Sequence, residues 1–222
     1  MASTDENREE WRAIRAFVYQ LAHTVFSGEP NADLFAVLAS QECRDTLHGA
    51  GKMSGDAMKA LAGFCDGLVD AATDLTACVE KSLSEYNRAI AGLGANRESH
   101  PWESAYTSSR KLLFQVETLE VRNAYRAFGY LPEMYPKVAD DHIALECAFL
   151  AALARKMLDE PDDGKYSVGS RDFLRDHLLR WIDDYAAAVH IDVPDGLYDL
   201  TASALAEFVH VDVVLLEAEF AK

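Results

Sequence analysis

Three ionisable residues stand in a row before an apolar stretch: Asp140, Asp141 and His142 precede the segment IALECAFLAAL. A helix of that composition is expected to be buried on most of its faces. Carboxylates at its N-terminus would satisfy free N–H groups and oppose the helix dipole, for about 0.3–1 kcal/mol each. The same three groups would also suit a binding site. Capping and ligand binding are therefore the two interpretations of this segment.

A metal site is a further interpretation of these residues. Residues four apart share one helix face, so Glu146 joins Asp141 and His142 in offering oxygen and nitrogen ligands. The sequence has no glycine-rich phosphate loop, no G-x-S-x-G elbow and no H-E-x-x-H motif. We therefore predict no catalytic residue, no metal and no cofactor. The alternative is a helical protein that binds a small molecule, a nucleotide or a metal through the cluster Asp140, Asp141 and His142.

Aromatic and acidic side chains also gather in the preceding part of the chain. Trp102, Glu103 and Tyr106 follow a proline, and Tyr86 and Ile90 lie one helical turn apart shortly before them. A guanidinium group stacks on aromatic rings and donates paired hydrogen bonds to carboxylates, so this combination suits an arginine-bearing ligand. Packing in the core is the alternative for each aromatic side chain.

The net charge and the composition limit which kinds of molecule the protein is expected to bind. The formal net charge is −16 over 222 residues, and half of the residues are hydrophobic. Such a field repels phosphate backbones and attracts cations, which argues against nucleic acid and favours a basic peptide, although acidity also serves solubility.

The N-terminal sequence and the cysteines predict where the protein resides. The first twenty residues are charged with both signs and lack the layout of a signal peptide, and no apolar run reaches the roughly 18 residues of a membrane span. The four cysteines stand singly, without a C-x-x-C pair. We therefore expect a cytoplasmic protein with reduced thiols, and no stable membrane insertion.

Apolar residues recur at helical spacing along almost the whole chain. The pattern predicts an all-α protein: a single compact domain over residues 1–222, with about nine or more helices and a stiff connector near 130–140 that could divide it into two subdomains. The predicted helices are 5–26, 31–40 with Asn31 as cap, two helices within 54–94 divided near DAATD, 109–128 ended by Gly129, the apolar helix after His142, a single helix over 171–189, and 194–220. The segment DEPDDGKYSVGS is predicted to end the helix after His142 and so to separate it from the helix over 171–189.

Read in order, three segments resemble the TorD/DmsD/NarJ group of redox-enzyme maturation chaperones, in its TorD-like branch. They are EYNRAIAGLG, HPWESAYTSSRKLLFQVETLEVRNAYRAFGYLP and ADDHIALECAFLAAL, over about residues 85–153. The group's signature is an aromatic residue with an apolar pair, a Pro-Trp-Glu-Ser-x-Tyr loop, and Glu-Pro-x-Asp-His before an apolar helix. Val138 and Ala139 replace the usual Glu-Pro, and the apolar pair is the smaller Ala89-Ile90.

The resemblance implies a non-catalytic, all-helical cytoplasmic chaperone. Its partner would be the precursor of a molybdopterin-dependent oxidoreductase of the DMSO reductase family, bound through the twin-arginine leader, the apo-enzyme body or both. Binding would aid cofactor insertion and delay export until assembly. The stiff connector permits a monomer or a segment-swapped homodimer.

The resemblance also places a peptide-binding groove on eight residues. Apolar parts of the leader would lie on aromatic and aliphatic side chains, and its arginines would meet carboxylates. His142 would donate a hydrogen bond to Asp141 or to a backbone carbonyl and would not act as a base. The eight predicted site residues are Tyr86, Ile90, Trp102, Glu103, Tyr106, Asp140, Asp141 and His142.

Overall fold

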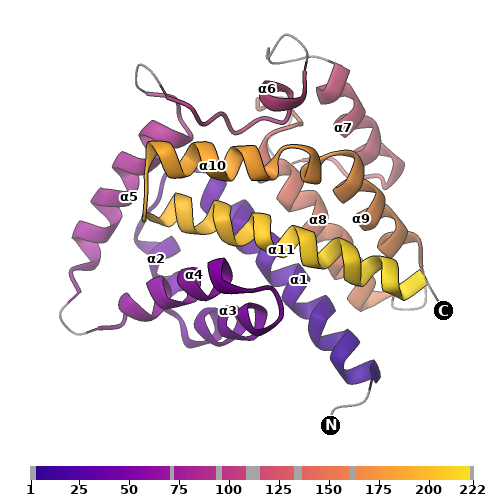
Figure 1. Cartoon of the computed structure of the whole chain (residues 1–222), viewed down its shortest axis with the longest axis horizontal. Helices are drawn as coiled ribbons and strands as arrows, with labels where there is room; N and C mark the ends of the chain where they lie inside the picture. The colour runs from indigo at the N-terminus through magenta and orange to yellow at the C-terminus, as the bar shows by residue number, and fades with distance from the viewer. Residues whose placement is uncertain are drawn as a thin grey trace.

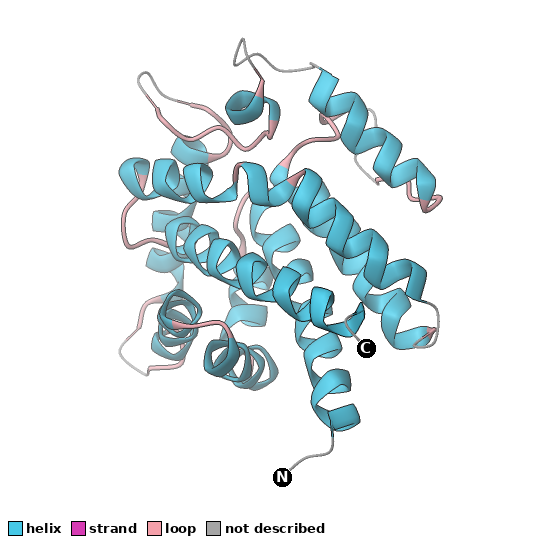
Figure 2. Cartoon of the chain, turned by 45° about the vertical axis from the view of Figure 1, so that its right-hand side comes forward, coloured by secondary structure: helices cyan, strands magenta, loops and turns pink. Residues whose placement is uncertain are grey.

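The computed structural model describes residues 4–70, 73–93, 97–108, 116–132, 137–160 and 164–220. Within these ranges the chain forms eleven α-helices and one short 3-10 helix, and no strand (Figure 2). The prediction of an all-α protein with nine or more helices is confirmed.

The helices follow one another with short connections. Their bounds are α1 (Thr4–Phe26), α2 (Ala32–Ala39), α3 (Gln41–Met53), α4 (Asp56–Gly67), α5 (Leu75–Ala89), α6 (Ser104–Thr107), α7 (Val116–Ala127), α8 (Ile143–Asp159), α9 (Gly164–Asp176), the 3-10 helix η1 (Leu178–Arg180), α10 (Ile182–Asp192) and α11 (Leu197–Phe220).

Local sequence explains several helix ends. The Asn31 side chain accepts a hydrogen bond from the Leu34 N–H, which confirms the predicted cap of α2. Asp74 caps α5 in the same way, so α4 and α5 are divided where DAATD predicts. Gly129 follows α7 with a φ of +65°, a conformation that glycine adopts without steric cost. The predicted C-cap is confirmed, while residues 109–115 of the predicted helix lie outside the described residues.

The prediction of a single helix over 171–189 is wrong. Helix α9 ends at Asp176, η1 follows, and α10 begins at Ile182. The break occurs because His177 and Trp181 turn toward the loop around α6, where they contact Glu103 and Tyr106. Helix α9 also begins at Gly164, within the segment predicted to be a separator.

Sequence reasoning did not predict helix α3. Its cap is present in the sequence, since the Ser40 side chain accepts a hydrogen bond from the Cys43 N–H at 3.2 Å. Leu47 and Ala50 provide its buried face.

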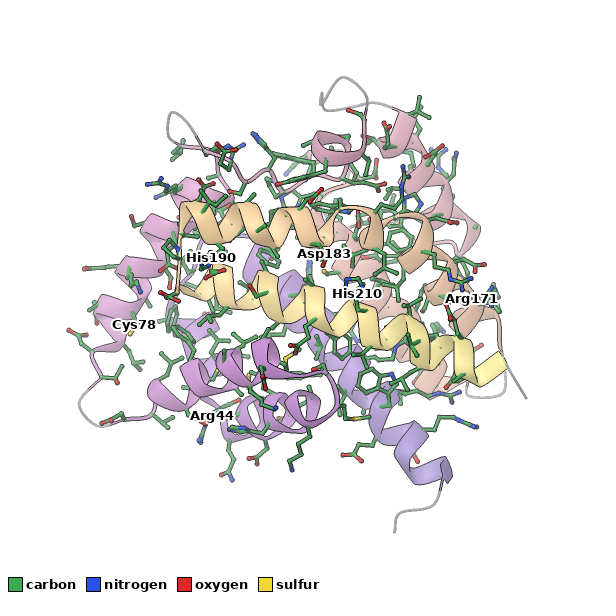
Figure 3. All side chains as sticks on the ribbon, in the orientation of Figure 1. Arg44, Cys78, Arg171, Asp183, His190 and His210 are labelled. Atoms are coloured by element: carbon green, nitrogen blue, oxygen red, sulfur yellow. The ribbon has the colours of Figure 1, made fainter. Side chains whose placement is uncertain are left out.

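Helices α1, α8 and α11 form the centre of the molecule (Figure 1). Helix α1 packs most extensively along α8, and α11 packs on α4 and α10. In Figure 3, Asp183 of α10 and His210 of α11 face each other, with an Nε2–Oδ2 distance of 3.0 Å. Helix α8 is buried along nearly all of its length, as its composition predicts.

A buried ion pair joins α1 to α11. The Arg15 Nε lies 2.6 Å from Asp212 Oδ1, and both side chains are fully buried. The Tyr19 hydroxyl donates to Asp212 Oδ2 at 2.7 Å, and the Trp11 indole N–H donates to Oδ1 at 3.2 Å. One ion pair and two hydrogen bonds to this carboxylate compensate for its removal from water and fix the register of the two helices.

Three of the four cysteines are buried and Cys78 is partly exposed; all four are free thiols. Among the helices that the structure describes, none is both long and apolar enough to cross a bilayer.

Candidate peptide-binding site

The loop containing Trp102 and the segment before α8 are joined by backbone hydrogen bonds. Trp102 and His142 form an isolated antiparallel bridge. The Glu103 N–H donates to the Asp141 carbonyl at 2.9 Å, and the Ile143 N–H donates to the Pro101 carbonyl at 2.9 Å. Two motifs that lie about forty residues apart in the sequence therefore form one joint, which we call the α6–α8 joint.

Asp141 holds this joint from inside. Its Oδ2 accepts a hydrogen bond from the Ser104 N–H at 3.0 Å, and its Oδ1 accepts one from the Thr118 hydroxyl at 3.0 Å. The side chain is fully buried. The carboxylate thus connects the segment before α8 to the start of α6 and to α7.

His142 caps helix α8. Its Nδ1 accepts a hydrogen bond from the Ala144 N–H at 3.1 Å, so the ring is neutral with its proton on Nε2. Burial and the nearby His23 lower the pKa of His142 to about 3. Capping of α8 is therefore observed for His142, whereas the carboxylates of Asp140 and Asp141, which were expected to cap this helix, bind other groups. The sequence predicts that His142 donates a hydrogen bond to Asp141 or to a backbone carbonyl. Its Nδ1 does not donate, because this nitrogen accepts the hydrogen bond from Ala144.

Asp140 is paired with an arginine of the chain itself. The Arg122 guanidinium on α7 places Nε 2.8 Å and Nη2 2.6 Å from Asp140 Oδ2. The Asp140 side chain is 2% exposed, whereas that of Arg122 is 30% exposed. The Tyr125 hydroxyl donates to the Asp140 backbone carbonyl at 2.9 Å.

Glu103 is also paired within the chain. Its Oε2 lies 3.0 Å from His177 Nδ1, and its Oε1 lies 3.6 Å from Arg180 Nη1. Burial raises the pKa of Glu103, although His177 and Arg180 favour the charged form. Burial and the neighbouring Glu103 and Asp141 carboxylates hold the pKa of Glu146 well above its usual range. The interior of the joint is therefore rich in carboxyl groups.

Two aromatic side chains lie at the edge of the joint and are partly exposed. The Trp102 ring meets the His142 ring edge-on, with centroids 5.3 Å apart. The Tyr106 ring stacks on Trp181 at 5.5 Å, and its hydroxyl accepts a hydrogen bond from the His100 N–H at 3.0 Å. Burial raises the pKa of Tyr106 to about 12, so the phenol stays neutral.

The other two predicted residues lie on α5, away from the joint. The Tyr86 ring is partly buried against Tyr198 of α11, with centroids 6.0 Å apart. Ile90 is buried at 4% exposure. Helix α5 packs against α2, α10 and α11. The structure thus brings six of the eight predicted residues together and places Tyr86 and Ile90 on a neighbouring element.

Sequence reasoning missed the partners that occupy the carboxylates. These are Ser104, Thr118, Arg122, His177 and Arg180. Ser104 belongs to the quoted Pro-Trp-Glu-Ser motif, and the other four carried no signal of this role.

The three residues of the alternative metal or nucleotide site have different partners. Asp140 binds Arg122, Asp141 binds Ser104 and Thr118, and His142 binds the backbone of α8. Within the described ranges, no group of three or more histidine, cysteine or acidic residues is placed to hold a metal ion. The geometry gives no support to that alternative.

Residues 54–187 match the sequence profile of the nitrate reductase delta subunit family. A search of curated proteins gave no match. Since the matched range covers more than half of the chain, the chain belongs to this family.

Members of this family are cytoplasmic, non-catalytic chaperones that assist the maturation of molybdoenzymes. The resemblance to the NarJ and TorD chaperones is thereby confirmed.

Proposed function

We propose that this chaperone binds the precursor of a molybdopterin-dependent oxidoreductase of the DMSO reductase family and recognises its twin-arginine leader. Binding would keep the precursor competent for cofactor insertion and delay its export. The observation that carries this proposal is the α6–α8 joint, a rigid edge with two partly exposed aromatic rings above buried acids. The net charge of −16 adds a long-range attraction for a basic leader.

The aromatic residues supply the apolar contacts in this proposal. Trp102 and Tyr106 would cover the apolar stretch of the leader, and the partly exposed Tyr86 would extend that surface along α5, whereas Ile90 is buried and would not contact the leader. Trp102 and Tyr106 are held by ring contacts and hydrogen bonds, so little side-chain entropy is lost on binding. Aromatic side chains that are rigid before binding are typical energetic anchors of interfaces.

The acids contribute in two ways. Glu103 and Asp140 already hold Arg180 and Arg122, whose side chains are 45% and 30% exposed. We propose that the leader arginines take these two places while the chain's own arginines turn to solvent. Asp141 and His142 keep the joint in shape, because Asp141 binds the first residue of α6 and Thr118 of α7, and His142 caps α8.

Calorimetric titration with a leader peptide tests this proposal. The leader should bind more tightly than the same peptide with both arginines changed to lysine, because only guanidinium forms paired hydrogen bonds with carboxylates. Binding should weaken at high salt. Equal affinity for the two peptides, or no binding to several leaders, would contradict the proposal.

Variants of the arginines that pair with these acids within the chain test whether the leader binds at the α6–α8 joint. Arg122→Gln should free Asp140 and tighten leader binding, by about tenfold if one charge-assisted contact no longer has to be displaced. Arg126→Gln is the matched control, because Arg126 is exposed on the same helix. Equal effects of the two substitutions would show that only the net charge changed.

A further inference from the structure

A second groove lies between α1 and α3, with a volume of about 410 Å³. On α1 it is lined by Glu10, Ala13, Ile14 and Phe17. Ala13, Ile14 and Phe17 follow Glu10 by three, four and seven positions, so the four residues share one face of the helix. Ile14 is buried and Phe17 partly buried, so they form an apolar floor below the exposed Glu10.

Helix α3 forms the other wall with the same spacing. Glu42, Asp45 and Gly49 follow one another along its exposed face. The groove thus has an apolar floor with a carboxylate on one wall and two on the other. None of the three carboxylates forms an ion pair or side-chain hydrogen bond within the described part of the chain.

Most basic side chains of the two helices have other partners, and Lys52, the last base of α3, does not line the groove. Arg15 binds Asp212 of α11, and Arg12 donates to the Met157 carbonyl of α8. Arg44, labelled in Figure 3, lies 3.5 Å from Asp66, and His48 binds the same carboxylate at 2.8 Å. The groove therefore presents negative charge that the chain's own bases do not neutralise.

Gly49 is the second feature that distinguishes this groove. Glycine inside a helix lowers helix stability relative to other residues. The fold does not require glycine here, since a Cβ at this position would meet only the Ile14 side chain, at an ordinary distance of 3.9 Å. The missing side chain leaves the groove open at its centre, where another segment can approach the α3 backbone closely.

We propose that the α1–α3 groove binds an amphipathic helix of a partner protein, whose apolar stripe is flanked by arginine or lysine. Apolar side chains of that helix would lie on Ile14 and Phe17 beside Gly49, and its basic side chains would meet Glu10, Glu42 and Asp45. Recognition of a helix in a groove through residues at helical spacing is a recurring binding mode. Three carboxylates without an internal base give the charge complementarity that selects a basic partner.

This surface is separate from the α6–α8 joint. In Figure 1, α6 lies at the top of the molecule and α3 near the bottom, on opposite sides of α10 and α11. The two sites also share no lining residue. The groove therefore gives the chaperone a second contact for a partner, independent of leader recognition.

The probe is a synthetic helical peptide with leucines along one face and arginines on both sides of them. Its control is the same peptide with glutamine in place of arginine. Fluorescence anisotropy with the full-length protein should show binding of the arginine peptide that weakens with salt, and at least about tenfold weaker binding of the glutamine peptide.

Two pairs of variants locate the site. Gly49→Leu fills the groove and should weaken binding about tenfold or more without lowering the melting temperature, since leucine is the better helix former. Gly63→Leu is its control, because Gly63 lies inside α4 with no atom within 4 Å of an added Cβ. Binding by Gly63→Leu should be unchanged.

The second pair tests charge without adding bulk. The triple variant E10Q/E42Q/D45N should weaken binding about tenfold, while E80Q/E120Q/D159N, which removes the same charge from other exposed sites, should have a much smaller effect. Equal losses in both triple variants, or binding by Gly49→Leu at the parent affinity, would overturn the proposal.

Discussion

Replacing Asp141 by alanine should destabilise the protein strongly. Asp141 is fully buried and accepts hydrogen bonds from the Ser104 N–H and the Thr118 hydroxyl, both at 3.0 Å. A hydrogen bond to a charged group contributes about 1.5–3 kcal/mol. Loss of both bonds should therefore lower the free energy of unfolding by about 3 kcal/mol or more, against a typical total of about 5–15 kcal/mol.

Urea unfolding followed by circular dichroism measures this loss, with the slope m checked for constancy. Asp141→Asn keeps one carbonyl acceptor and should lose roughly half as much. Thr118→Val removes only one of the two bonds, so a double-mutant cycle with Asp141→Ala should show coupling of about 1 kcal/mol or more. Glu120→Ala, at an exposed position of α7, is the control and should stay within about 0.5 kcal/mol of the parent.

The result also separates two roles of Asp141. A loss below about 1 kcal/mol for Asp141→Ala, with no coupling to Thr118, would refute the interpretation that this carboxylate holds the α6–α8 joint. If Asp141→Asn folds normally and leader affinity falls, the residue contacts the ligand directly, as the sequence predicts.

Three further predictions concern single positions. The folded-state pKa of His142 lies near 3, below the usual value of 6.5, so the contribution of neutral His142 to the free energy of unfolding is present above about pH 6.5 and is lost as the pH falls toward 3. His142→Asn keeps a capping acceptor that does not titrate, and its unfolding free energy in urea should fall less steeply over this range. The unfolding free energy of the wild type should fall by up to about 1.4 kcal/mol more per pH unit than that of the variant. Parallel pH curves for the two proteins would contradict the role of His142 as a cap. Gly169→Ala should cost about 1–3 kcal/mol, because the added Cβ would overlap the Phe128 ring; Gly63→Ala, in open space, should instead stabilise by about 0.5–1 kcal/mol. Trp102→Ala should weaken leader binding by about 2 kcal/mol in calorimetry while leaving the unfolding midpoint nearly unchanged, since its ring is partly exposed.

Helical periodicity predicted most of the fold because each helix buries one face. The stripe of α1 and the apolar length of α8 can be read directly from the spacing. The break between α9 and α10 could not be read in this way. Leu174, Leu178 and Trp181 continue the helical spacing across it, and the break follows from contacts to Glu103 and Tyr106, more than seventy residues earlier.

The order of motifs predicted which segments would meet, and the structure joins Trp102 to His142. The sequence did not predict which side chains pair with the carboxylates. Nothing in the spacing of Arg122 or Arg180 shows that these arginines, among 21 lysines and arginines, reach Asp140 and Glu103. Such pairings depend on how α7 and η1 pack against the joint, and the sequence signal for that packing is spread over many residues.

Hydrogen exchange with and without the leader peptide tests the central claim most directly, because it reports where on the protein the leader binds. The account predicts slower exchange in peptides that contain residues 97–108 and 137–145, and at the end of α5 near Tyr86. The matched leader with lysines in place of both arginines should give weaker protection. Strong protection confined to other elements, with these segments unchanged, would contradict leader recognition at the α6–α8 joint.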